Sequence, residues 1–143
     1  MSDYYCTTRT NYFRVKDESK FREIMSLVRG DECDVSLWDD RVDNSGNKLF
    51  GFGCYGFIYG IFDEDDEYDD GAYDRFLRLL KTCVADDDAI IIFESGHEKL
   101  RYVCGDAVIV TSSEIASVDL TYQAIDKARE MLGKTDWTSR CEY

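Results

Sequence analysis

LFGFGCYGFIYGIF, residues 49–62, is the stretch that decides the fold, because aromatic and branched side chains alternate in it with glycines. Aromatic and β-branched residues favour strands, and glycine within a strand indicates a bulge or the close approach of another segment. The stretch therefore predicts a long strand with bulges or with close packing under a helix. Its GFGCYG segment does not predict a phosphate-binding loop, since it lacks a Lys-Ser/Thr ending and leads into more strand.

Strand and helix signals lie on both sides of this stretch. Before it, residues 4–15 predict a strand, Asp17 predicts the cap of a helix that ends at Gly30, and residues 34–38 predict a second strand. After it come one helix following residue 71, a strand over 89–94, one or two strands within 99–111, and a helix over about 120–132. The residues predicted to face inward from these two helices are Tyr73, Phe76, Leu77, Leu80, Val84, Ile125, Ala128 and Leu132.

The element order β-α-β-β-α-β-β-α begins with the order of a split βαβ unit. It predicts a single α+β domain over residues 1–143, with a mixed or antiparallel sheet and about three helices, mainly on one face. A chain of 143 residues with 44% hydrophobic and 14% aromatic residues is suited to one folded domain. No apolar run approaches the roughly 20 residues of a membrane span, and no secretory signal opens the chain. We therefore expect a cytoplasmic protein.

The six cysteines are widely spaced and include no CxxC pair. Several of them lie beside apolar residues, where a free cysteine behaves as a small core residue. Together with the absence of a secretory signal, this spacing predicts reduced thiols. Zinc is not expected, because the only histidine, His97, has no cysteine within ligand spacing.

Negative charge is concentrated in two segments. Residues 62–74, FDEDDEYDDGAYD, contain eight carboxylates and no cation, and residues 31–43 contain six carboxylates and Arg41. These segments contribute −8 and −5, which together equal the net charge of −13, so the remaining 117 residues are neutral overall. A surface that served solubility alone would not require negative charge to be concentrated in two segments.

A calcium loop is one interpretation of residues 62–74. With Gly71 at the sixth position of an EF-hand loop, Tyr68 stands at the third, where an oxygen ligand is required, so this interpretation fails. Asp69 and Asp70 precede a predicted helix, where carboxylates stabilise free N–H groups. The other six carboxylates repel one another, and they face either a partner or water.

The stretch ESGHEKLRY, residues 94–102, resembles an enzyme site more than any other part of the chain. It matches the HExxH zinc motif only at its first two letters, because Arg101 occupies the position of the second histidine. A charged hairpin turn is the simpler interpretation. A small ligand-binding domain or enzyme around Glu94, His97 and Glu98 remains an alternative.

Direct nucleic-acid binding is not expected, since the basic residues are scattered and the net charge opposes phosphate. The reverse arrangement is favoured, because alternate carboxylates on an extended segment lie about 6.7 Å apart and imitate a row of phosphates. Tyr68 and Tyr73 would supply aromatic contacts. The predicted partner-binding residues are Asp63, Glu64, Asp65, Asp66, Glu67, Tyr68, Asp69, Asp70, Tyr73, Asp74, Asp39, Asp40 and Asp43.

Three stretches, TNYFRVKD, GFGCYGFIYG and SGHEKLRYVCGDAVIVT, resemble small acidic uncharacterised proteins of phages and conjugative elements of gut Firmicutes. The resemblance brings no catalytic motif and therefore no site residues. As a class, such proteins are similar to anti-CRISPR and antirestriction proteins.

The resemblance implies a non-enzymatic inhibitor that acts in the bacterial host cell. Its acidic surface would occupy the nucleic-acid channel of a basic host nuclease, an RNA-guided one. An immunity-type protein that neutralises a basic toxin is the alternative with the same charge logic. Neither function requires a catalytic residue, a cofactor, a metal or a membrane.

Overall fold

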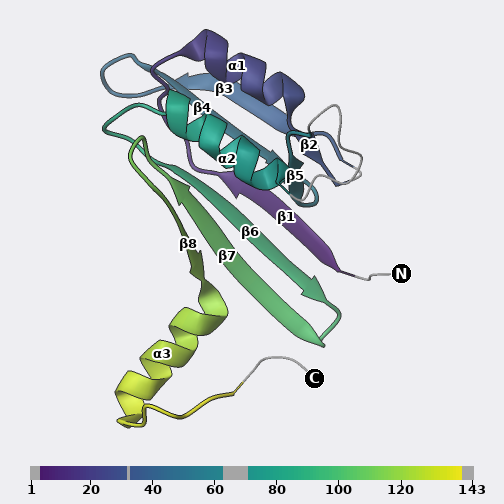
Figure 1. Ribbon diagram of the computed structural model, residues 1–143, viewed down its shortest axis with the longest axis vertical. Helices are drawn as coiled ribbons and strands as arrows, with labels where there is room; N and C mark the ends of the chain where they lie inside the picture. The colour runs from purple at the N-terminus through teal and green to yellow at the C-terminus, as the bar shows by residue number, and fades with distance from the viewer. Residues whose placement is uncertain (1–3, 32, 63–70, 140–143) are drawn as a thin grey trace.

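The computed structural model describes residues 4–31, 33–62 and 71–139, and it confirms a mixed α+β fold (Figure 1). The elements are β1 (Tyr5–Thr10), α1 (Glu18–Leu27), β2 (Arg29–Gly30), β3 (Ser36–Val42), β4 (Lys48–Cys54), β5 (Ile58–Gly60), α2 (Ala72–Cys83), β6 (Ile90–Glu98), β7 (Tyr102–Val110), β8 (Ile115–Asp119) and α3 (Leu120–Leu132).

Six strands form one antiparallel sheet in the order β3-β4-β1-β6-β7-β8, and β2 pairs with β5 in a small second sheet. The neighbours β3-β4-β1-β6, connected through α1 and α2, reproduce the split βαβ order. The hairpin β6–β7 and strand β8 then extend the sheet beyond this unit.

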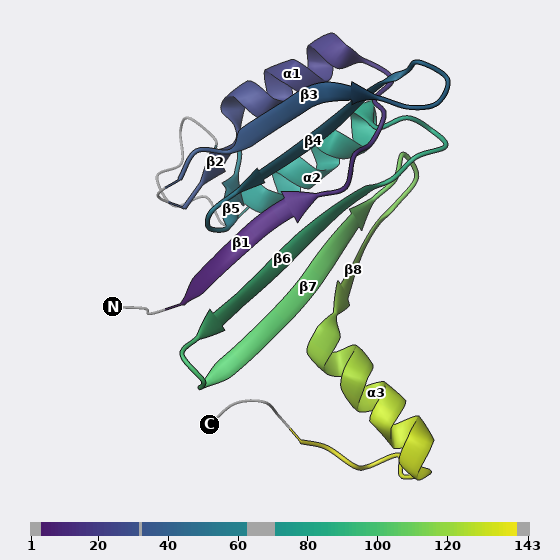
Figure 2. The same cartoon turned by 180° about the vertical axis from the view of Figure 1, so that it is seen from behind.

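Helices α1 and α2 cover one face of the sheet, which we call the helix face. The opposite face, which we call the open face, is covered by no helix of the described residues (Figure 2). The core lies between α1, α2 and the helix face, where five phenylalanines are at most 1% exposed and contact one another mainly edge to face. They are Phe13, Phe21, Phe50, Phe52 and Phe76.

The glycine-rich stretch forms two strands, β4 and β5, rather than one long strand. At the end of β5, Gly60 has a φ of +121°, and a Cβ there would collide with the backbone of Ala72 at the start of α2. Only glycine fits this position, which brings β5 close enough for the N–H of Ile61 to donate to the Ala72 carbonyl at 3.1 Å. Close packing against a helix is therefore confirmed at Gly60. Gly53, by contrast, lies under the Trp38 side chain of β3 on the open face.

The C-terminal hairpin is longer than predicted. Strand β6 continues through the SGHE segment to Glu98, and β7 passes through Gly105 without a break. The turn lies at residues 99–101, where Lys99 adopts a φ of 50° and the N–H of Arg101 donates to the Glu98 carbonyl at 3.0 Å. The unbroken register from Ile90 to Glu98 outweighs the turn propensity of Ser and Gly.

Helix α3 has the predicted bounds, but its predicted inward face is covered only in part, since Ile125 and Ala128 are half-buried and Leu132 is exposed. Asp119 caps its first turn and Gly133, in the left-handed region, ends it. No residue of α3 is buried, and Leu132 is 52% exposed. The physical reason is that β8 carries the chain to the edge of the sheet, so α3 extends away from it instead of returning over the helix face (Figure 1). No helix in the described residues is long and apolar enough to cross a membrane.

Candidate functional site

Three carboxylates lie side by side on three neighbouring strands. Glu94 of β6 is paired in register with Asp106 of β7, and Asp106 is paired with Asp119 at the end of β8. Directly paired residues of antiparallel strands point to the same face and lie about 4.5–5.5 Å apart. We call Glu94, Asp106 and Asp119 the carboxylate row.

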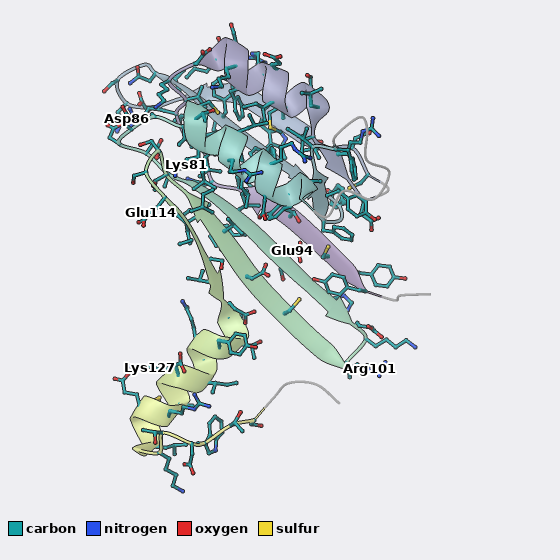
Figure 3. The ribbon with its side chains drawn as sticks, viewed as in Figure 1. Lys81, Asp86, Glu94, Arg101, Glu114 and Lys127 are labelled. Carbon is teal, nitrogen blue, oxygen red and sulfur yellow. The ribbon has the colours of Figure 1, made fainter. Side chains whose placement is uncertain are left out.

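The row lies where the helix face emerges from under α2. Ile90 and Ile92 of β6 are buried in the core, and Glu94 follows them on the same face because strand side chains alternate with a period of two. In β7, Asp106 shares its face with Val108 and Val110, which pair with Ile92 and Ile90. Figure 3 shows Glu94 just beyond α2, between this helix and the hairpin tip that carries Arg101.

No lysine or arginine in the described part of the chain forms an ion pair with the carboxylate row. Burial, followed by the charge of Asp106, raises the pKa of Glu94, although a hydrogen bond from Tyr4 opposes the shift. Burial and the charge of Asp119 raise the pKa of Asp106. The row therefore contains negative charge that the described residues do not neutralise.

Two tyrosines border the row. The hydroxyl of Tyr4 donates to Glu94 Oε2 at 3.2 Å and lies 3.1 Å from Cys104 Sγ. Tyr73, in the first turn of α2, lines a cavity of about 200 Å³ together with Glu94 and Asp106. Burial, and then the charges of these two carboxylates, raise the pKa of the Tyr73 phenol. The Tyr73 hydroxyl group therefore stays protonated at neutral pH and can act as a donor, as that of Tyr4 does to Glu94.

The predicted partner-binding residues are only partly described. Residues 63–70, which contain Asp63, Glu64, Asp65, Asp66, Glu67, Tyr68, Asp69 and Asp70, lie outside the described residues. Asp74 is exposed in the first turn of α2. Tyr73 is half-buried and packs against Phe76, with ring centroids 6.5 Å apart. The structure thus brings Tyr73, near the end of the acidic stretch 62–74, into one cavity with two carboxylates that sequence reasoning did not connect with it.

The structure does not bring Asp39, Asp40 and Asp43 to this site. They lie on β3 and the turn after it, and β4, β1 and β6 separate β3 from β7 in the sheet. Asp39 accepts a hydrogen bond from Arg22 at 2.7 Å, which lowers the pKa of its carboxyl group. Asp43 holds its own turn, because its Oδ1 accepts from the N–H groups of Ser45 and Asn47. Asp40 is exposed.

The three residues of the alternative enzyme site do not share a face. Glu94 and Glu98 point to the helix face, and Glu98 forms an ion pair with Arg101 at 3.4 Å. His97 points to the open face, where its ring lies 6.1 Å from that of Tyr5. Alternation along β6 produces this separation, since positions 94 and 97 differ by an odd number. In the described part of the chain, no three His, Cys, Asp or Glu side chains are arranged to hold a metal ion.

Sequence reasoning missed Asp106 and Asp119, because residues 99–111 were predicted only as one or two strands without a register, and β8 was not predicted. Extending the alternation of Ile90 and Ile92 to Glu94, and that of Val110 and Val108 to Asp106, would have placed both carboxylates on one face. No protein-family model matches the chain, and no curated protein or solved structure matches it significantly. A functional assignment therefore depends on the residues of this chain.

Proposed function

We propose that the protein is a non-enzymatic inhibitor that binds a basic, nucleic-acid-handling nuclease of the host, as anti-CRISPR proteins do, through an acidic surface. The observation that supports this proposal is the carboxylate row, which holds Glu94, Asp106 and Asp119 on adjacent strands without a cationic partner in the described residues. Like charges placed directly opposite in a sheet are destabilising, and a folded protein that retains them gains when a cation binds.

The partner that fits this surface carries lysine or arginine side chains. Arginine donates planar pairs of hydrogen bonds to carboxylates, and the channels that bind nucleic acid are rich in it. Burial raises the pKa values of Glu94 and Asp106, and the charge of the neighbouring carboxylate raises them further; a bound cation would offset this second contribution. The hydroxyl of Tyr73, in the same cavity, adds a donor beside the acceptors.

The sequence also favours attraction between this protein and a basic partner. The acidic stretch of residues 62–74 ends in the first turn of α2, and Tyr73 belongs both to that stretch and to the cavity beside the row. A concentrated negative field of this kind accelerates association with a basic partner, and the acceleration falls as ionic strength rises. Tyr73, in the described end of this stretch, therefore lies beside the row on the surface that a second protein would meet.

Two variants of equal charge test the proposal. Glu94→Gln/Asp106→Asn removes two charges from the row. Asp86→Asn/Asp87→Asn removes two charges from the loop after α2, where these carboxylates pair with Lys16 and Arg14. Figure 3 shows Asp86 beyond the end of α2 that is farther from Glu94. Each variant is added to a panel of purified RNA-guided nucleases loaded with guide RNA. DNA cleavage and binding kinetics are measured at two salt concentrations.

We expect the parent and the loop variant to inhibit at least one nuclease equally, and the row variant to bind it at least tenfold more weakly. A coupling of about 1.5 kcal/mol or more for one close charge pair corresponds to that factor. If no nuclease is inhibited, the proposed function is wrong. If inhibition occurs and both variants retain it, the function stands and the carboxylate row is not its site.

A further inference from the structure

Two cysteine thiols meet at Gly56, in the turn between β4 and β5. Cys33, in the segment between β2 and β3, places its Sγ 3.1 Å from the position that a Cβ of Gly56 would occupy. Cys54, the last residue of β4, donates from Sγ to the Gly56 carbonyl at 3.5 Å. Segments 21 positions apart in the sequence thus bring their sulfur atoms against the same glycine.

The absence of a side chain at Gly56 lets the Cys33 sulfur approach this turn. Its φ of +151° lies in the region that other residues rarely adopt, and a side chain there would press on Cys33 Sγ. Gly30 leaves space on the other side of the same sulfur, since a Cβ at Gly30 would lie 2.7 Å from it. The local backbone therefore accommodates Cys33 closely against the end of β4.

We propose that Cys33 and Cys54 are a modification site, at which a peroxide converts the two thiols into a disulfide. The sulfur of Cys33, which is half-buried, attacks one peroxide oxygen, breaks the O–O bond and becomes a sulfenic acid, while the other oxygen leaves as an alcohol or water. The Cys54 sulfur then attacks the sulfenic sulfur and displaces water. The two thiols lose two electrons and the peroxide gains them.

The relative exposure of the two sulfurs fixes this order. Cys33 is half-buried, whereas Cys54 is only 8% exposed. Burial, and then the hydrogen bond with Cys33, raise the pKa of Cys54 to about 12, which disfavours its thiolate as the first nucleophile. Cys33 is therefore the sulfur that a dissolved oxidant reaches, and Cys54 is the resolving thiol.

The sheet register excludes two neighbouring pairs, Cys6–Cys104 and Cys6–Cys54. Cys6 and Cys104 are both paired with Gly96, from opposite sides of β6. Two strand spacings separate their Cα atoms by about 9.6 Å, beyond the roughly 7 Å that a disulfide tolerates. Cys6 is also displaced by two positions from Cys54, whose partner on β1 is Thr8. That diagonal places the Cα atoms about 7–8 Å apart.

The bridge would attach the segment between β2 and β3 to the end of β4. This segment carries Asp31, whose N–H donates to the Phe57 carbonyl at 2.9 Å and whose carboxylate accepts from Tyr59 at 2.9 Å. Oxidation would therefore fix one end of the acidic segment 31–43. The inference concerns chemistry at these two sulfurs and does not depend on the proposed inhibitor function.

Peptide mapping tests the proposal directly. The folded protein is treated with hydrogen peroxide, unreacted thiols are blocked with N-ethylmaleimide in denaturant, and the chain is digested with trypsin without reduction. Cleavage after Arg29, Arg41, Lys48 and Arg75 produces peptides 30–41 and 49–75, each with one cysteine. A cross-link between them thus identifies the bridge without ambiguity. Cys33→Ser and Cys104→Ser serve as matched variants, since both positions are half-buried.

We expect peptides 30–41 and 49–75 to be recovered as one disulfide-linked species that dithiothreitol separates. The free thiols of the parent should fall from six to four, because one bridge consumes two of them. Cys104→Ser should still form the link, and Cys33→Ser should not. The absence of the link in the parent, a predominant link between other peptides, or an equal loss of thiols in Cys33→Ser would overturn the proposal.

Discussion

The half of the molecule under α1 and α2 and the half formed by β8 and α3 differ in what their side chains contact. In the first half, Phe52 and Phe76 are completely buried and their rings lie 5.7 Å apart. In the second, no residue of α3 is buried and β8 is an edge strand. The first half therefore contains most of the hydrophobic stabilisation, which scales with the apolar area removed from water.

The carboxylate row lies at the boundary between these two halves. Glu94 is the next residue after Ile92 on the same face of β6, where Ile92 is 2% exposed, and Asp119 directly precedes the exposed helix α3. A rigid core on one side fixes the position of Glu94 and Asp106, and the open side leaves the row accessible. This arrangement shows how one sheet can position a charged site without burying it. Substitutions in the two halves test this difference, and they follow in order of decreasing expected effect on stability.

Phe52→Ala should have the largest effect, because it leaves a cavity in the centre of the core. Removing a buried phenylalanine costs about 3–5 kcal/mol of unfolding free energy. The matched change is Phe93→Ala, on the open face of β6, where the ring is 51% exposed; its cost should stay below about 1 kcal/mol. Urea unfolding of both variants measures the difference. Equal costs would contradict the assignment of the core to the helix face alone.

Removing a helix cap should have an intermediate effect on stability, and this effect should differ between the two halves. Asp17 accepts the N–H of Lys20 at 3.0 Å at the start of α1, and Asp119 accepts the N–H of Thr121 at 2.9 Å at the start of α3. Loss of a cap costs about 1 kcal/mol. Asp17→Ala should lower the midpoint of global unfolding by that amount, because α1 is part of the core.

Asp119→Ala should instead loosen α3 and leave the global midpoint nearly unchanged. Hydrogen exchange of residues 120–132 would report the local loss of protection. Asp119→Asn is the control, since asparagine keeps the cap and removes the charge. A fall in the global midpoint as large as that of Asp17→Ala would show that α3 unfolds together with the core.

The same contrast explains which features the sequence could predict. The helix bounds near Asp17 and Gly133 and the α2 face with Phe76 and Leu80 follow local rules, and the structure confirms them. The inward face of α3 could not be predicted, because periodicity identifies an apolar stripe but not the element that covers it. Which element covers α3 depends on where β8 leaves the sheet. This in turn depends on the strand order, which is set by long-range pairing.

The candidate site was predicted less completely than the fold. Tyr73 and Glu94 were singled out for different functions, and only the register of β6 with β7 and the start of α2 brings them into one cavity. Asp39 and Asp43 were grouped with the acidic stretch by charge alone. In the structure each has a local partner, Arg22 for Asp39 and the turn N–H groups for Asp43. Total charge in a sequence window does not distinguish such paired carboxylates from unpaired ones.

The smallest expected effect is the pH dependence of the carboxylate row. Burial raises the pKa of Glu94 and Asp106, so the folded protein holds these protons more tightly than the unfolded chain does. Ionisation therefore destabilises the fold above the raised pKa values, and this cost is absent below the ordinary values of 4.5 and 3.8. Glu94→Gln/Asp106→Asn should accordingly be more stable than the parent at pH 7, by about 0.5 kcal/mol, and the gain should shrink as pH falls from 6 to 4.

Asp43→Ala should behave oppositely, because hydrogen bonds from Asn47 and Ser45 lower the pKa of Asp43 and stabilise its charged form. It should lose stability at pH 7, and the loss should diminish as pH falls through the lowered pKa. Urea unfolding across this pH range measures both. A gain that does not depend on pH would show that the row is not under electrostatic repulsion.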